Sequence, residues 1–215
     1  MKILAICGAK QKERNTAAML KSAYDGAMSV AGAEGEFVWL YDLNYTGCVG
    51  CHACKVKGGA SFAKCAVRDD LTEVLNKAIE ADVLLLGSPM YFNDVTGNLR
   101  QFIERFYFPG MTYNMPKPGE GRVPTYPKRC KMGWVFTMNA PGDFYKNFFE
   151  QLMSGAMIVA EKSEYVMAWG TQQFEDYDKY EASMFDVPTV KQRHIEQFPK
   201  DCADAYEMGK RLAGG

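Results

Sequence analysis

Four of the seven cysteines lie close together in one glycine-containing segment. Cys48, Cys51 and Cys54 follow one another at every third position, and ten residues then separate Cys54 from Cys65. Thiolate sulfur is a ligand for zinc and for iron–sulfur clusters, and a [4Fe–4S] cluster needs four such ligands. The segment is therefore a candidate cluster site, with a zinc site or simply reduced thiols as the alternatives. His52 lies inside the pattern and is interpreted as a loop residue rather than a ligand.

A second stretch, residues 2–20, predicts an anion site after a buried strand. Residues 2–7 (KILAIC) are apolar enough for a central parallel strand, and Gly8 ends it. Asn15 and Thr16 lie where a helix N-cap belongs. Free backbone N–H groups and the positive end of the helix dipole would point at the loop. The loop also carries basic side chains, namely Lys10, Lys12 and Arg14.

The spacing of this loop excludes two common phosphate sites. It contains neither the G-x-G-x-x-G pattern of dinucleotide-binding folds nor the G-x-x-x-x-G-K-[ST] pattern of a P-loop. A loop of hydroxyl and amide groups around a single phosphate remains, as FMN would need. The alternative is an ordinary capped first helix of an α/β domain.

The loop from Ser88 to Gly97 is a second candidate site. It follows the clearest buried strand, residues 82–87 (DVLLLG), and Pro89 stiffens its turn. Its centre holds Met90, Tyr91, Phe92 and Asn93. A flat, partly apolar wall with backbone donors suits an aromatic ring ligand. The alternative is that the two aromatic side chains only pack the loop onto the sheet.

Strand-like and helix-like segments alternate along the chain and would bring these loops to one edge of a sheet. Strands are expected at residues 2–7, 36–40, 82–87, 131–138 and 164–168. Helices are expected at residues 16–30, 71–81, 98–106, 144–160 and 199–212. The alternation predicts an α/β fold with a doubly wound, five-stranded parallel sheet and helices on both faces. Ligands of such sheets bind at the carboxyl ends of the strands, here at loops 8–16, 88–97 and 137–143.

At 215 residues the chain fits a single domain, residues 1–215. Two long segments interrupt the alternation: a cysteine loop at about 47–66 and a proline-rich insertion at about 107–129. A loop as long as the insertion is often functional, although an inconsequential surface insertion is the alternative. Residues 172–190 show no clear period.

Composition limits the class of partner and compartment. A net charge of −1 and a pI of about 6.2 give no reason to expect nucleic acid or an anionic membrane surface as a partner. No apolar run approaches the ~20 residues that span a bilayer, and the first residues do not fit a signal peptide. We therefore expect a cytoplasmic protein without a disulfide framework. The isolated cysteines, Cys7, Cys130 and Cys202, are expected to be packed or exposed thiols.

Taken together, the two loops resemble the NADPH-dependent FMN reductase family. The resemblance rests on Gly8-Ala9-Lys10, Asn15-Thr16, residues 88–93 (SPMYFN) and residues 97–105 (GNLRQFIER). The cysteine segment followed by Asp69-Asp70 resembles the iron–sulfur flavoprotein branch of that family. These patterns cover roughly the first half of the chain, whereas the second half matches only in strand rhythm.

The resemblance implies a flavodoxin-like fold and an FMN-binding oxidoreductase that takes electrons from NAD(P)H. The acceptor would be a flavin, a quinone or another small molecule; the alternative is an electron carrier with FMN and a [4Fe–4S] cluster, serving a redox protein. Members of the family commonly form homodimers or homotetramers. No catalytic nucleophile or acid–base pair is expected, because the hydride chemistry belongs to the cofactor.

The resemblance also assigns residues. Lys10, Asn15 and Thr16 would hold the FMN phosphate, residues 89–93 would line the isoalloxazine ring, and residues 137–139 would lie near that ring. The implied FMN-binding residues are Gly8, Ala9, Lys10, Asn15, Thr16, Ala17, Pro89, Met90, Tyr91, Phe92, Asn93, Thr137, Met138 and Asn139. The implied cluster ligands are Cys48, Cys51, Cys54 and Cys65.

The chain departs from the family pattern at two places. Ala9 stands where the family usually has serine, so one hydroxyl group for the phosphate is missing. The ten residues before Cys65 exceed the gap that is usual in the iron–sulfur branch. A glycine-rich loop that folds back would still allow the four thiols to converge.

Overall fold

A five-stranded, all-parallel sheet forms the centre of the computed structural model, which describes residues 1–116 and 125–215. The strand order is β2-β1-β3-β4-β5, so the chain winds outwards in both directions from β1. The strands are β1 (Lys2–Cys7), β2 (Glu34–Trp39), β3 (Val83–Pro89), β4 (Cys130–Thr137) and β5 (Ala160–Ala168). The predicted doubly wound α/β fold is confirmed.

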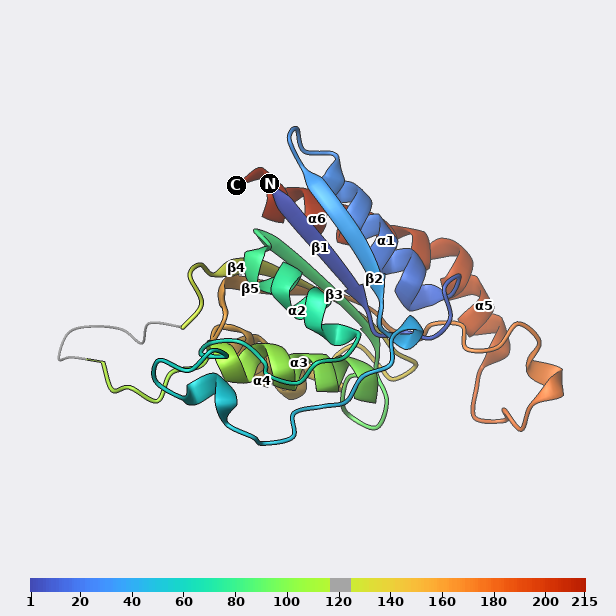
Figure 1. The fold of residues 1–215 in the computed structure, drawn as a ribbon. Helices are drawn as coiled ribbons and strands as arrows, with labels where there is room; N and C mark the ends of the chain where they lie inside the picture. Colours follow the sequence, from blue (N-terminus) through green and yellow to red (C-terminus); the bar gives the residue numbers. More distant parts are fainter. Residues whose placement is uncertain (117–124) are drawn as a thin grey trace.

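Helices cover both faces of the sheet. They are α1 (Asn15–Met28), α2 (Leu71–Glu80), α3 (Gly97–Gly110), α4 (Lys146–Ala156), α5 (Val187–Glu196) and α6 (Phe198–Gly214). Figure 1 shows α1 and α6 side by side on one face, with α2, α3 and α4 on the other. In the described part of the chain, no helix is both long and apolar enough to cross a membrane.

Alternate side chains of the strands pack into two separate hydrophobic cores, one on each face of the sheet. Leu4 and Ile6 of β1 pack into the core beneath α2, α3 and α4, whereas Ile3 and Ala5 pack into the core beneath α1 and α6. A strand that is buried on both faces has no polar side to show, which is why β1 and β3 appear as continuous apolar runs in the sequence.

Two expected segments had wrong boundaries. The helix expected at 144–160 is shorter, because α4 ends at Ala156 and β5 already begins at Ala160. The insertion expected at about 107–129 begins later, since α3 continues through Pro109 to Gly110, whereas its expected end agrees with β4, which begins at Cys130. Residues 117–124 of this insertion lie outside the described residues.

Helix α5 was not expected, and only its first four residues belong to the segment 172–190 that shows no period. None of its ten residues is buried, so it carries no hydrophobic pattern that a sequence could reveal. Its start signal was nevertheless present: the Asp186 carboxylate accepts the Thr189 N–H at 3.4 Å, and a proline lies in the first turn.

Candidate functional site

The first loop leaves β1 and is held between β3 and α3. The Gly8 N–H donates to Gly87 O at 2.8 Å, and Thr96 Oγ1 donates to Gly8 O at 2.7 Å. A Cβ atom on Gly8 would lie only 2.9 Å from Leu99 Cβ and from Thr96 Oγ1. Glycine at this position therefore allows α3 to begin directly against the end of β1.

The N-terminus of α1 faces this loop without a side-chain cap. Its N-cap residue is Arg14, not Asn15 or Thr16 as expected, and the first turn holds no acidic side chain. The first helical hydrogen bond runs from the Ala18 N–H to Arg14 O at 2.9 Å, so the N–H groups of residues 15–17 precede the hydrogen-bond ladder. These N–H groups and the helix dipole fit an anion such as phosphate.

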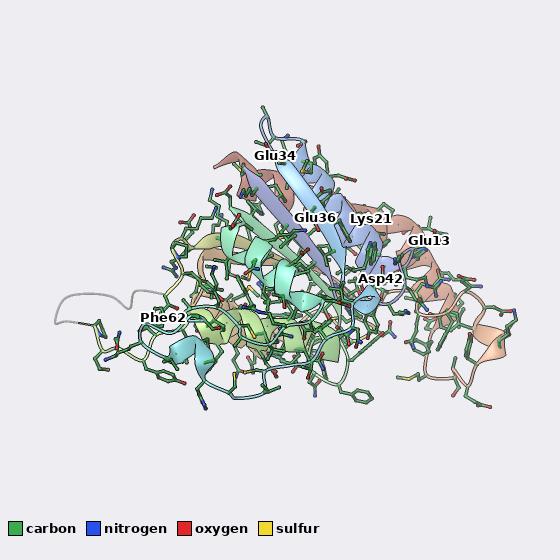
Figure 2. All side chains as sticks on the ribbon, viewed as in Figure 1. Glu13, Lys21, Glu34, Glu36, Asp42 and Phe62 are labelled. Atoms are coloured by element: carbon green, nitrogen blue, oxygen red, sulfur yellow. The ribbon has the colours of Figure 1, made fainter. Side chains whose placement is uncertain are left out.

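The three basic side chains of the loop have different surroundings. Lys12 forms an ion pair with Asp42, which Figure 2 labels near the end of β2. Arg14 forms an ion pair with Glu175 at 2.8 Å. The Lys10 ammonium lies 5.8 Å from the centre of the Tyr41 ring and is exposed.

The structure brings the three expected loops together around the start of α1. The buried hydroxyl oxygens of Thr16 and Thr137 lie 2.6 Å apart, which joins the first turn of α1 to the end of β4. The Met90 N–H donates to Thr137 O at 2.9 Å and joins the second loop to the same point. Asn15 Nδ2 donates to Gln172 O at 2.8 Å. Met138, the residue after Thr137, is buried.

A fourth segment, residues 171–175, was not expected at this site. Besides the bond from Asn15, Gln173 O accepts Arg14 Nη2 at 2.7 Å, and the Gln173 side chain bonds the exposed Asn139 amide. Irregular segments give no periodic signal, so the sequence offered no pattern that would place these backbone carbonyls beside the first loop.

The second loop forms a tight turn with unusual backbone angles. Tyr91 and Asp94 exchange backbone hydrogen bonds of 2.9 and 3.1 Å, while Phe92 and Asn93 between them have φ angles of 50° and 65°. The Phe92 side chain is fully exposed, and that of Tyr91 is 57% exposed. The alternative that these rings pack the loop onto the sheet is therefore wrong. Strained, exposed residues of this kind commonly belong to ligand sites.

The four clustered cysteines line one cavity. Cys54 is buried, Cys65 is partly buried, and Cys48 and Cys51 are exposed at its rim. The ten-residue gap folds back, because the Ala63 N–H donates to Cys54 O at 3.0 Å. Four sulfur donors around one cavity are the donor set that a [4Fe–4S] cluster takes.

The thiols do not form a closed metal site. Within residues 1–116 and 125–215, no group of three or more His, Cys, Asp or Glu side chains is placed so that it could hold a metal ion. Burial raises the pKa of the Cys54 thiol. The four cysteines therefore line one cavity, but their side chains are not placed so that they would hold a metal ion together.

Arg105 of α3 forms the inner wall of the cysteine cavity. Burial acts to lower its pKa, but hydrogen bonds to Asp69 and Cys65 outweigh burial, so the pKa is raised and the guanidinium stays charged. Arg105 belongs to the stretch 97–105 that resembles the FMN reductase family, but the sequence predicts no role for this residue. A signal existed: Arg105 lies three positions after the core residue Phe102, hence on the same side of the helix.

The two candidate sites lie near opposite ends of α3. At its N-terminus, Thr96 caps the helix and contacts the first loop. At its C-terminus, Lys55 Nζ donates to the carbonyl oxygens of Phe108, Pro109 and Met111. At 1.5 Å per residue, Thr96 and Arg105 are about 14 Å apart along the helix. Figure 2 likewise places Phe62 of the cysteine loop far from Asp42 beside the first loop.

Comparison with known proteins gives a family and a set of relatives. The family model described as NADPH-dependent FMN reductase matches residues 1–122. An iron–sulfur flavoprotein of Methanocaldococcus jannaschii is 38% identical over 105 residues, which cover 49% of this chain and 51% of that protein. An iron–sulfur flavoprotein of Archaeoglobus fulgidus is 39% identical over 105 residues, which cover 49% and 48%. The chain thus spans about half the length of the curated relatives it matches.

Solved structures share the whole fold at low sequence identity. The NAD(P)H:quinone oxidoreductase from Methanothermobacter marburgensis superposes with a TM-score of 0.66 and 13% identity, over 99% of this chain and 96% of that chain. An azoreductase from Bacillus anthracis gives a TM-score of 0.64 and 13% identity, over 98% and 99%. At this identity the likeness concerns the flavodoxin-like fold alone.

Proposed function

Because the chain belongs to the NADPH-dependent FMN reductase family, we propose that it binds FMN and passes electrons from NAD(P)H to a flavin, a quinone or another small acceptor. When bound, FMN supplies the redox chemistry, taking a hydride (two electrons and a proton) from the nicotinamide and returning electrons to the acceptor. The observation that carries this proposal is the meeting of three loops around the uncapped start of α1.

The backbone N–H groups of residues 15–17 would hold the phosphate. The hydroxyl pair of Thr16 and Thr137 would add a donor, because only one of the two protons is used between the oxygens and the other is free to point outwards. Lys10 would add charge from the exposed side. Ala9, buried where the family usually has serine, would contribute only backbone.

The second loop would supply the wall of the ring site. Exposed Tyr91 and Phe92 offer apolar surface, and the end of β4, residues 137–139, closes the same corner through the bond from Met90 to Thr137. These residues would bind and orient the ring and exclude water from one of its faces. None of them needs to transfer a proton.

The experiment is an absorption spectrum of anaerobically purified protein, followed by addition of FMN and then of NADH or NADPH. We expect flavin bands near ~370 and ~450 nm that bleach with NAD(P)H and return with an acceptor. A colourless protein that also refuses added FMN would contradict the proposal. If flavin binds but neither NADH nor NADPH reduces it, the protein is an electron carrier and not an NAD(P)H-dependent reductase.

A second function is favoured by the cysteine cavity: an electron carrier that holds FMN and a [4Fe–4S] cluster and serves a redox protein. Four cysteines line the cavity, and four curated relatives bear the name iron–sulfur flavoprotein. Iron and acid-labile sulfide assayed on the same sample should each approach about four per chain. Flavin without iron would leave these cysteines as thiols.

A homodimer or homotetramer also remains a prediction, which light scattering would measure.

A further inference from the structure

Arg105 connects the cysteine cavity to the core of the protein. Its side chain has no exposed surface. Nε donates to Cys65 Sγ at 3.3 Å, Nη1 donates to Thr46 O at 2.9 Å and to Asp69 Oδ2 at 2.5 Å, and Nη2 donates to Val67 O at 3.1 Å. One guanidinium therefore holds both ends of the cysteine segment and also reaches a sulfur atom inside it.

The position of this guanidinium is fixed by two helices. Arg105 is part of α3, and its partner Asp69 accepts the Leu71 N–H at 3.1 Å at the start of α2. A buried charge is stable only when it is paired and hydrogen-bonded, so the pair with Asp69 keeps Arg105 in place. Burial acts to raise the pKa of Asp69, but the hydrogen bond and charge of Arg105 outweigh it, and this pKa lies below its usual value. The N–H bond that points at Cys65 is thus held rigidly.

We propose that Arg105 is the positioning residue of the cysteine site, holding Cys65 at the cavity and donating to its sulfur so that the reduced state of a bound cluster is stabilised. Hydrogen bonds to ligand sulfur atoms are among the factors that set the potential of an iron–sulfur cluster. A donor stabilises the state with more negative charge, so the midpoint potential rises. The inference rests on the second proposed function, the cluster.

Arg105→Lys is the decisive variant, with Arg68→Lys as its matched control. Lysine keeps the charge beside Asp69 but loses the planar set of donors that reaches Cys65, Thr46 and Val67 together. Arg68 also lies beside Cys65, but it is exposed and donates to the Cys65 carbonyl oxygen at 3.4 Å rather than to sulfur. Both variants replace an arginine beside Cys65 with lysine, but only Arg105→Lys changes the residue that donates to the sulfur atom.

The measurement is the midpoint potential of protein reconstituted anaerobically with iron and sulfide, together with its iron and FMN content. For Arg105→Lys we expect a more negative potential, or loss of iron at unchanged FMN content, whereas Arg68→Lys keeps both values of the unmodified protein. If Arg105→Lys fails to fold, the double variant Arg105→Met with Asp69→Asn removes the unpaired charge, and the same result is expected of it.

Two results would overturn the inference and are distinguishable. Unchanged potential and iron content in the folded variant would show that Arg105 does not act on the cluster. If the unmodified protein takes up FMN but no iron, the cluster proposal is wrong and the inference that rests on it is wrong too, while the FMN proposal stands.

Discussion

At the scale of single residues, the turn after β3 is the most unusual feature of the candidate flavin site. Phe92 and Asn93 both have positive φ angles, which side chains with a Cβ atom adopt at a cost of about 1 kcal/mol each. The turn is held from outside, since the Asp94 carboxylate accepts the Val95 N–H at 2.7 Å and pairs with Arg100. The exposed Phe92 ring gains no burial in return for this strain.

We predict that Phe92→Asn stabilises the protein without flavin and weakens FMN binding. Asparagine tolerates the left-handed region better than phenylalanine, so the free energy of unfolding should rise by about 0.5–1 kcal/mol. Urea denaturation and a flavin titration measure the two effects. Tyr91→Asn is the control, because Tyr91 is exposed but has no positive φ angle, and it should bring no gain in stability. A loss of stability in Phe92→Asn would contradict the interpretation.

At the scale of elements, α1 and α6 approach each other backbone to backbone. A Cβ atom on Gly209 would lie 1.8 Å from Ala23 O, and one on Gly26 would lie 2.0 Å from Tyr206 O. Each glycine is thus needed for contact with the opposite helix. Because α1 also begins at the candidate phosphate loop, this contact supports the position of the site.

We predict that Gly209→Ala destabilises the protein by about 1–3 kcal/mol, because the helices must move apart. Alanine is otherwise the better helix former by about 1 kcal/mol, so the sign of the effect is informative. Gly214→Ala is the control in the same helix, since nothing lies within 4 Å of its added Cβ atom. Chemical denaturation of both variants measures the difference, and equal stabilities would disprove the close approach.

At the scale of the whole molecule, the candidate flavin site lies at the carboxyl edge of the sheet, and the length of α3 separates it from the cysteine cavity. The candidate flavin loops lie near the start of α3, where Thr96 contacts Gly8, and the cysteine cavity lies against the last turns of the helix. The described chain thus offers two candidate redox sites on one rigid helix.

We predict that FMN raises the unfolding temperature and that riboflavin, which lacks the phosphate, raises it less. Ligand at 100 times its Kd adds about 2.7 kcal/mol, which for a chain of this length corresponds to roughly 5–10 °C. Differential scanning fluorimetry at matched ligand concentrations measures both shifts. Equal shifts for the two ligands would show that the N-terminus of α1 does not hold the phosphate.

The sequence alone determined the succession of strands and helices along the chain, the fold class and the positions of the two loops. These features have local causes: β1 and β3 are apolar because both of their faces are buried, and Gly8 and Pro89 mark where strands give way to loops. The cysteine spacing likewise is visible in the sequence, because ligand type and interval are local properties.

Only the tertiary structure decided which distant groups meet. It joined Thr16 to Thr137, brought the carbonyl groups of Gln172 and Gln173 to the first loop, and folded Arg105 into the cysteine cavity. Such contacts join residues far apart in the sequence, and they depend on how helices pack on the sheet rather than on the pattern of any one segment. The chemistry of each segment was therefore predictable, whereas its partners were not.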